Sequence, residues 1–192
     1  MSYLTEKDII EIQSNVRLLS IKDVGDISHF LFDSYIEEYN DFLKVADKFY
    51  DLCISKTFLL IHKFTDELLA YMTLSADSIK LTNEEKEVHD IGKVPYASIP
   101  ALKVGKLAVN RSISNAVKRK GYGSFMLEMA RAFAFDMNES GIACRFLTVD
   151  ADIEYNPNTP DFYKRNGFVE NLSNGKRNAK HTISMRKDIF AD

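Results

Sequence analysis

The segment Lys118-Arg119-Lys120-Gly121-Tyr122-Gly123-Ser124 lies between an apolar run, Leu107–Val109, and a long stretch with helical spacing. Its two glycines remove side chains where an anion must approach the backbone, and N–H groups converge at the start of a helix. The three preceding cations add positive charge. The segment therefore predicts a phosphate site. The alternative is a tight start of a helix beside a solvated basic patch or a nucleic-acid contact.

The residues on both sides of this segment predict a strand before it and a helix after it. Ala101–Asn110 becomes continuously apolar, as in a strand inside a sheet, and Gly105 would permit a bulge or a close backbone approach. From Gly123 onward apolar residues recur at helical spacing, and Gly141 is placed to end that helix. The members of this apolar stripe are Met126, Leu127, Ala130, Phe133, Ala134 and Met137.

Other phosphate-binding motifs do not fit the segment. A Walker loop would end in Gly-Lys-Ser/Thr, and the dinucleotide fingerprint would need a third glycine where Met126 stands. The sequence thus supports neither nucleotide hydrolysis nor hydride transfer.

The rest of the chain alternates between predicted strands and predicted helices. Before the phosphate segment the pattern indicates a strand, two helices, an antiparallel hairpin and a polar segment that is either a solvated loop or an excursion from the fold. These are Val16–Lys22, Asp23–Tyr39, Asp41–Ser55, the pair Thr57–Phe64 and Glu67–Leu74, and Asp77–Pro100. After it we expect a strand, a short helix with Thr159 as N-cap and Pro160 as first helical residue, two further strands and a polar turn. The strands are Ala143–Val149, Phe168–Val169 and Thr182–Lys187, Asn166–Gly167 ends the helix, and the turn is Asn174–Lys180.

Composition sets broad limits on the class of protein. With 192 residues, 45% of them hydrophobic and 28% charged, we expect one domain over residues 1–192. The net charge of -3 gives no general attraction to nucleic acid or to a membrane. The start of the chain has no signal-peptide pattern and no apolar run reaches the roughly 18 residues of a membrane span, so a cytoplasmic protein is expected.

The residues that commonly bind metal give no metal site. Cys53 and Cys144 lack the spacing of a zinc or redox motif and are predicted to be reduced thiols in the core. His62 is expected to be an ordinary strand residue. We therefore expect no metal.

The order of elements, with two motifs, resembles the Gcn5-related N-acetyltransferase superfamily. Its acetyl-CoA turn has the pattern Gln/Arg-x-x-Gly-x-Gly/Ala, and here Lys118 replaces the first residue while Gly121 and Gly123 match. Its short helix with an aromatic pair followed by Gly-Phe corresponds to Asp161–Phe168. The likeness is best over Ala101–Val169. It implies an α/β (α+β) fold with a mixed, mostly antiparallel central sheet of about six to seven strands flanked by helices.

The resemblance also implies a reaction. An acetyl group would pass from acetyl-CoA, the cosubstrate, to a primary amine by direct attack in a ternary complex. The hydroxyl of Tyr163 would be the general acid that protonates the departing thiolate, because phenols have a pKa of about 10. The implied cofactor-binding residues are Leu107, Ala108 and Val109 along the pantetheine arm, Lys118, Arg119, Lys120, Gly121, Tyr122, Gly123 and Ser124 at the pyrophosphate, and Asn156.

Several alternatives stay open. No general base stands out among Glu84, Glu85, Glu87, His89, Asp90, Asp150 and Asp152. The chain could bind CoA without catalysis. Gly105–Val109 is also similar to a branch that includes toxins acetylating aminoacyl-tRNA. Nucleic acid is expected as a partner only in that case, with a basic rim formed by Lys103, Lys106, Lys118, Arg119 and Lys120. The class of amine acceptor and the existence of a homodimer are not decided by the sequence.

Overall fold

The computed structural model describes residues 3–172 and 181–191, and the predicted turn at Asn174–Lys180 lies outside them. The strands are β1 (Val16–Ser20), β2 (Lys56–His62), β3 (Leu68–Lys80), β4 (Ser98–Val109), β5 (Phe146–Asp152), β6 (Val169–Glu170) and β7 (Thr182–Asp188). The helices are α1 (Glu6–Asn15), α2 (Ile21–Val24), α3 (Glu37–Asp51), α4 (Asn83–Val88), α5 (Tyr122–Glu139) and α6 (Thr159–Arg165).

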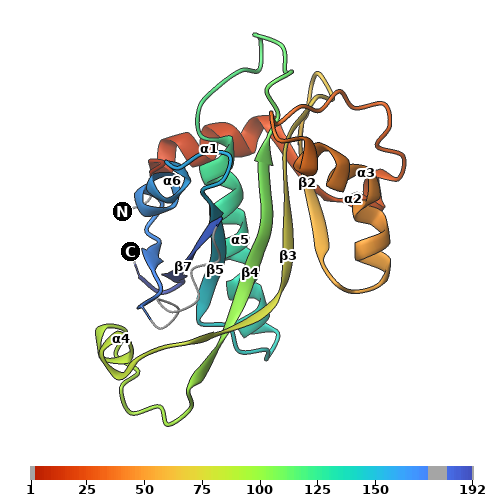
Figure 1. Ribbon diagram of the computed structural model, residues 1–192. Helices are drawn as coiled ribbons and strands as arrows, with labels where there is room; N and C mark the ends of the chain where they lie inside the picture. Colours follow the sequence, from red (N-terminus) through yellow and green to blue (C-terminus); the bar gives the residue numbers. More distant parts are fainter. Residues whose placement is uncertain (1–2, 173–180, 192) are drawn as a thin grey trace. The chain divides into compact units, whose positions relative to one another are not determined.

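The described strands form one mixed, mostly antiparallel sheet of seven strands, flanked by helices (Figure 1). Their order is β1-β2-β3-β4-β5-β7-β6. This confirms the fold class that the sequence predicts. None of the described helices is both long and apolar enough to cross a bilayer.

Contacts between residues divide the chain into two compact units. The N-terminal unit contains Tyr3–Ser75 and Val104–Met129, and the C-terminal unit contains Ala76–Lys103 together with the described part of Ala130–Asp192. β3, β4 and α5 each contribute residues to both units. That residues 1–192 form a single domain stays a prediction.

In the N-terminal unit, β2 pairs antiparallel with both β1 and β3, which confirms the predicted hairpin. α2 and α3 lie beside β2 (orange in Figure 1) and enclose an apolar core. His62 is a half-buried strand residue, as predicted. The buried members of this core are Ile21, Leu43, Ala46, Leu59, Ile61, Leu68, Tyr71 and Ala108.

Two predictions for the N-terminal unit are wrong, and one helix was not predicted. The helix expected over Asp23–Tyr39 is present only at its two ends, in α2 and in the start of α3, because Gly25 adopts φ +74 and its N–H closes α2 on the carbonyl of Ile21. Residues 25–36 are irregular before α3 begins. Cys53 is exposed at the end of α3, whereas Cys144 is buried as expected. α1 is an additional helix, whose N-cap Thr5 forms a capping box with Asp8.

The predicted long helix is confirmed as α5. It ends as expected at Gly141, whose φ of +84 is the left-handed conformation that glycine adopts without strain. The N–H of Gly141 donates to the carbonyl of Asn138, and that of Ile142 donates to Met137. These two bonds satisfy carbonyls at the end of the helix.

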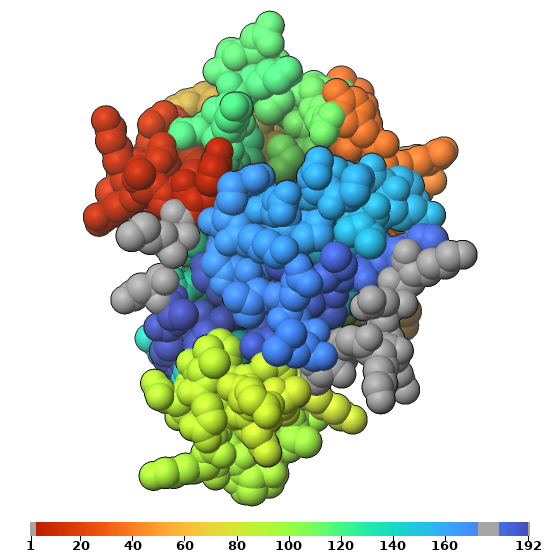
Figure 2. All heavy atoms as spheres, turned by 60° about the vertical axis from the view of Figure 1, so that its left-hand side comes forward, coloured from red at the N-terminus to blue at the C-terminus, as the bar shows by residue number. Residues whose placement is uncertain are grey.

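In the C-terminal unit, β7 pairs antiparallel with β5 and β6. The expected loop Asp77–Pro100 is wrong in part, because it contains the end of β3, the start of β4 and α4 between them. Thr82 and Glu85 form the capping box of α4. Figure 2 shows the yellow-green segment with α4 lying against blue segments near the end of the chain, where Glu85 pairs with Arg186 (2.6 Å).

Candidate functional site

The segment predicted to bind phosphate lies in the N-terminal unit, between the end of β4 and the start of α5. The N–H of Phe125 makes the first helical hydrogen bond, to the carbonyl of Gly121 (2.8 Å). The N–H groups of Tyr122, Gly123 and Ser124 therefore stand in the first turn, where a helix supplies no acceptor for them. Such amides carry partial positive charge and bind anions. The segment thus offers the backbone groups that a phosphate site needs.

Gly121 is required for two independent reasons. Its φ of +105 is a conformation that other residues rarely adopt. A Cβ atom at this position would also lie 2.8 Å from Cδ2 of Leu4, which precedes α1. The turn is therefore packed directly against the N-terminal segment of the chain.

The side chain of Tyr122 stabilises the loop that precedes α5. Its side chain is buried, and its hydroxyl donates a hydrogen bond to the carbonyl of Val117 (2.7 Å). Burial raises the pKa of the phenol above its ordinary value. Tyr122 can thus serve a ligand through its backbone N–H, while its side chain fixes the shape of the loop.

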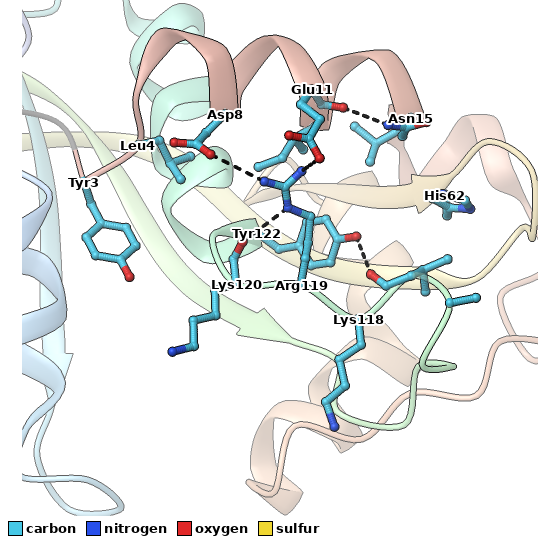
Figure 3. Close-up of a pocket in the computed structure, with 14 residues that line it drawn as sticks. Tyr3, Leu4, Asp8, Glu11, Asn15, His62, Lys118, Arg119, Lys120 and Tyr122 are labelled. Atoms are coloured by element: carbon cyan, nitrogen blue, oxygen red, sulfur yellow. Dashed lines mark hydrogen bonds and ion pairs between the residues drawn. The ribbon is translucent and has the colours of Figure 1, made fainter.

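The three cations before Gly121 differ in direction. Lys118 and Lys120 are exposed and extend away from α1, whereas the guanidinium of Arg119 is directed toward α1 (Figure 3). It donates to Oε1 of Glu11 (2.9 Å) and lies 3.7 Å from Oδ1 of Asp8. Arg119 thus has carboxylate partners on α1, and its role at a pyrophosphate stays a prediction.

The Thr73 hydroxyl contacts β4 just before Leu107–Val109. It accepts a hydrogen bond from the N–H of Lys106 (2.8 Å). A Cβ on Gly105 would lie 2.9 Å from the same hydroxyl, which confirms the predicted close approach. Leu107 and Val109 are half-buried, and Ala108 is buried in the core. Thr73 therefore fixes β4 beside the residues expected to hold pantetheine.

The five cations of the predicted basic rim differ in whether they pair with a carboxylate. Lys106 bonds Glu38 (2.6 Å) and lies over the Tyr39 ring, and Arg119 pairs with Glu11. In the C-terminal unit, Lys103 pairs with Asp150. Three of the five thus have carboxylate partners, while Lys118 and Lys120 extend into solvent.

Asn110 is a buried polar residue that sequence reasoning missed. Its amide nitrogen donates to the carbonyls of Leu31 and Leu68 (both 2.7 Å). Its amide oxygen accepts from the N–H groups of Asp33 (3.1 Å) and Ser112 (2.9 Å). All of its side-chain hydrogen-bonding capacity is directed to backbone, so it holds the end of β4 to the irregular segment before α3. In the sequence, the one sign of this role is that a polar residue directly follows an apolar strand.

Tyr163 lies on α6 in the C-terminal unit. It is buried, with 8% of its surface exposed, and its ring packs against Phe162 and Phe168 at centroid distances of 5.1 and 5.4 Å. Gly167 has φ +83, and the N–H of Phe168 returns to the carbonyl of Tyr163 (3.0 Å). The Gly-Phe pair therefore ends the helix and closes an aromatic cluster around this phenol.

Asn156 forms the turn that leads into α6. Its side-chain oxygen accepts from the N–H of Asn158 (3.0 Å), and its carbonyl accepts from the N–H and hydroxyl of Thr159. Thr159 is the first helical residue and Asn158 the N-cap, so the helix starts one residue earlier than predicted. Asn156 is exposed.

Several of the residues considered as the general base form ion pairs or hydrogen bonds within the fold. Glu85 is 3% exposed, pairs with Arg186 and accepts from the N–H groups of Thr82 and Leu172. Asp150 pairs with Lys103. Glu85 therefore has the contacts of a structural carboxylate.

His89 belongs to the same buried network. Its Nδ1 lies 3.1 Å from Oδ2 of Asp188, and its Nε2 accepts from Nε of Arg186 (3.3 Å). Both contacts fit a neutral ring that carries its proton on Nδ1. Burial lowers the pKa of His89, and the neighbouring Arg186 lowers it further. The described residues contain no group of three or more His, Cys, Asp or Glu side chains that could hold a metal ion.

Comparison with known proteins finds relatives by structure alone. No family model matches the sequence, and no curated protein matches it. A tyrosine-to-phenylalanine mutant of KacT is 22% identical with a TM-score of 0.70, covering 91% of this chain and 95% of that one. AtaT complexed with acetyl-methionyl-tRNAfMet is 21% identical with a TM-score of 0.65, covering 88% and 94%.

AtaTR bound with acetyl-CoA gives a similar result, at 20% identity and a TM-score of 0.65, with 90% of this chain and 93% of that chain covered. These similarities extend over nearly the whole length of both compared chains. The TM-scores show a shared fold, at sequence identities near 20%. The chain therefore has the fold of the Gcn5-related N-acetyltransferase superfamily.

Proposed function

We propose that this protein is an N-acetyltransferase that uses acetyl-CoA as cosubstrate and a primary amine as acceptor. The observation that carries the proposal is the turn at Gly121, which presents the first amides of α5, for which the helix supplies no acceptor. Structural neighbours include AtaTR bound with acetyl-CoA, which supports the same ligand here.

In the proposed complex the pyrophosphate of CoA lies on the N–H groups of Tyr122, Gly123 and Ser124. The amides of a helix N-terminus favour two adjacent phosphates, and Lys118 and Lys120 add charge from exposed positions. The pantetheine arm extends along the backbone of Leu107–Val109. A side chain at position 121 would require movement of Leu4, so the glycine lets the turn pack against the N-terminal segment.

In the proposed reaction the neutral amine nitrogen attacks the thioester carbonyl, which forms a C–N bond and then breaks the C–S bond. The thiolate takes a proton from the hydroxyl of Tyr163, and the new amide gives up its extra proton to solvent or to a base. Direct attack needs only that both substrates are held together. We assign no residue as base, because Glu85 and His89 have structural contacts.

A second candidate is a toxin that acetylates the amino group of an aminoacyl-tRNA. It is favoured by the AtaT neighbour, which is complexed with acetyl-methionyl-tRNAfMet. The exposed Lys118 and Lys120 could contact phosphate, whereas Lys103, Lys106 and Arg119 have carboxylate partners. Growth arrest on expression, together with acetylation of charged tRNA, would favour this candidate.

The test has two stages. Calorimetric titration with acetyl-CoA should show one site per chain, and no binding would refute the proposal. Thiol release is then measured with small amines, peptides and aminoacyl-tRNAs as acceptors. Release that depends on an amine supports an enzyme, whereas binding without release from any acceptor supports a protein that only holds CoA. Sedimentation of the same sample decides between a monomer and a homodimer.

A further inference from the structure

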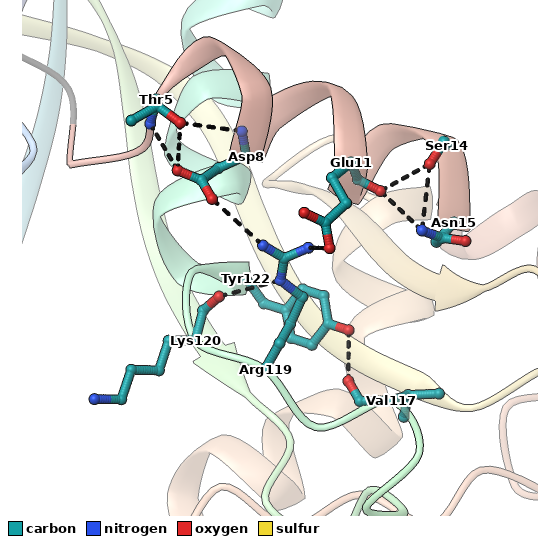
Figure 4. Close-up of polar contacts among 9 residues, drawn as sticks. All are labelled: Thr5, Asp8, Glu11, Ser14, Asn15, Val117, Arg119, Lys120 and Tyr122. Atoms are coloured by element: carbon teal, nitrogen blue, oxygen red, sulfur yellow. Dashed lines mark hydrogen bonds and ion pairs between the residues drawn. The ribbon is translucent and has the colours of Figure 1, made fainter.

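Arg119 lies near the start of the phosphate segment, and its guanidinium faces α1. Nη1 donates to Oε1 of Glu11 (2.9 Å), and Nη2 lies 3.7 Å from Oδ1 of Asp8. Nε donates to the carbonyl of Lys120 (3.4 Å), so the same side chain also contacts its own loop. Figure 4 shows the guanidinium between the two carboxylates.

The two carboxylates are held in place before they meet Arg119. Asp8 and Glu11 are three residues apart, so they share one face of α1. Oδ2 of Asp8 accepts from the N–H (3.0 Å) and hydroxyl (2.6 Å) of Thr5, which leaves Oδ1 for Arg119. The Thr5 bonds are the largest cause of a lowered pKa for Asp8, and Arg119 lowers it further. Asp8 is therefore a fixed anion next to the turn.

α1 and Leu4, which precedes the N-cap of α1, also contact the turn through apolar atoms. Leu4 blocks the space where a Cβ on Gly121 would lie, and Cδ1 of Ile12 is 3.7 Å from the same position. Ile12 is fully buried. The N-terminal helix thus supports the phosphate turn at two points, one apolar and one ionic.

A polar cavity of about 650 Å³ opens beside the ion pair. Its walls include α1 and the loop from Ala116 to Tyr122 (Figure 3). The side chains of Asp8 and Glu11 are 38% and 59% exposed, whereas that of Arg119 is 27% exposed. Without Arg119, two negative charges would stand near the turn and would repel an anionic ligand.

We propose that Arg119 is a positioning residue that holds the pyrophosphate turn to α1 through Glu11 and Asp8, and that it does not bind phosphate itself. The inference rests on the proposed function. It differs from the expectation for a basic loop residue, in which the guanidinium would contact the ligand directly. The two roles predict opposite results when the charges of Arg119 and Glu11 are exchanged.

The experiment measures the Kd of acetyl-CoA and of dephospho-CoA, which keeps the pyrophosphate, in 0.5 M salt to screen long-range attraction. Arg119→Glu should weaken both ligands at least tenfold, through lost positioning and a third negative charge. Adding Glu11→Arg to that variant should restore affinity to within about threefold of the original protein. The matched control adds Glu6→Arg instead, because it makes the same charge change on α1 at an exposed position. It should restore less than twofold.

A second variant separates shape from charge. Arg119→Lys keeps the charge but loses the fork that contacts two carboxylates, so we expect a three- to tenfold weaker Kd. The melting temperature of each free variant shows whether it folds, and affinity should change without a matching loss of melting temperature.

Three outcomes would overturn the inference. Failure of the exchange to restore affinity beyond the Glu6→Arg control would show that a positive charge is needed at position 119 itself. Unchanged affinity in Arg119→Lys would mean that a simple cation suffices. No acetyl-CoA binding by the original protein would refute the proposed function as well, which distinguishes that failure from the other two.

Discussion

The side-chain oxygen of Asn110 accepts a hydrogen bond from the N–H of Asp33, which lies 77 positions earlier in the chain. The next residue strengthens the connection, because the N–H of Arg111 donates to the carbonyl of Asp33 (2.8 Å). The guanidinium of Arg111 also lies 3.4 Å from the centre of the Tyr35 ring. The end of the strand expected to hold pantetheine is thus joined to the segment that precedes α3.

Asn110→Ala should therefore lower the free energy of unfolding by about 3 kcal/mol, because buried groups that lose a partner cost about 1–3 kcal/mol each. The affected groups are two carbonyls and two N–H groups. Urea unfolding measures the change.

The control for this prediction is Asn115→Ala, since Asn115 is exposed in the loop that follows. It should change the free energy of unfolding by less than about 0.5 kcal/mol. Equal losses in the two variants would show that the four bonds of Asn110 do not stabilise the fold.

Gly121→Ala should destabilise the protein more than Gly25→Ala. Both glycines have positive φ, so alanine is strained at both by about 1 kcal/mol. A Cβ at position 25 meets nothing within 4 Å, whereas one at position 121 meets Leu4 at 2.8 Å. The extra loss at position 121 should therefore shrink when Leu4→Ala is added, as measured by a double-mutant cycle. An additive result would contradict the steric argument.

The centre of the site could be predicted from sequence because its determinants are local. Gly121 and Gly123 lie within a single turn, and the apolar period that follows them specifies α5 over its whole length. Gly141 and Gly167 both end helices where the sequence places those ends. Each of these features depends on backbone conformation or on neighbours a few residues away.

What the sequence did not reveal depends on distant partners. α1 and α4 are short, and neither contains a long apolar stripe. The capping box of α4 has the Thr-x-x-Glu pattern, Thr82 to Glu85, whereas that of α1 pairs Thr5 with Asp8. The Arg119–Glu11 pair joins residues 108 positions apart, and no local pattern predicts such a contact. Gly25 interrupted a helical period that otherwise continued to Tyr39.

Because of His89, the free energy of unfolding should fall as the pH is lowered. Its pKa is lowered in the folded protein, chiefly by burial, so the unfolded chain, with a histidine pKa of about 6.5, binds the proton more readily. The contribution of His89 is therefore complete above about pH 6.5 and is lost as the pH falls toward its folded value. His89→Gln should flatten the pH dependence of the free energy of unfolding between about pH 5 and 6.5.

The control for this prediction is His29→Gln, because His29 is exposed. Its unfolding curve should follow that of the original protein across the same pH range. A slope that His89→Gln leaves unchanged would show that another group is responsible.

Tyr163→Phe should lower turnover at least tenfold while it leaves the Kd of acetyl-CoA within about twofold. Phenylalanine keeps the ring contacts with Phe162 and Phe168 and removes only the hydroxyl. The thiolate would then have to take its proton from water, which is a weaker general acid than a positioned phenol. Thiol release with an accepted amine measures turnover, and Tyr155→Phe, at an exposed tyrosine, is the control. Equal turnover in both variants would exclude Tyr163 as the acid, whereas a lost affinity for acetyl-CoA would assign its hydroxyl to binding.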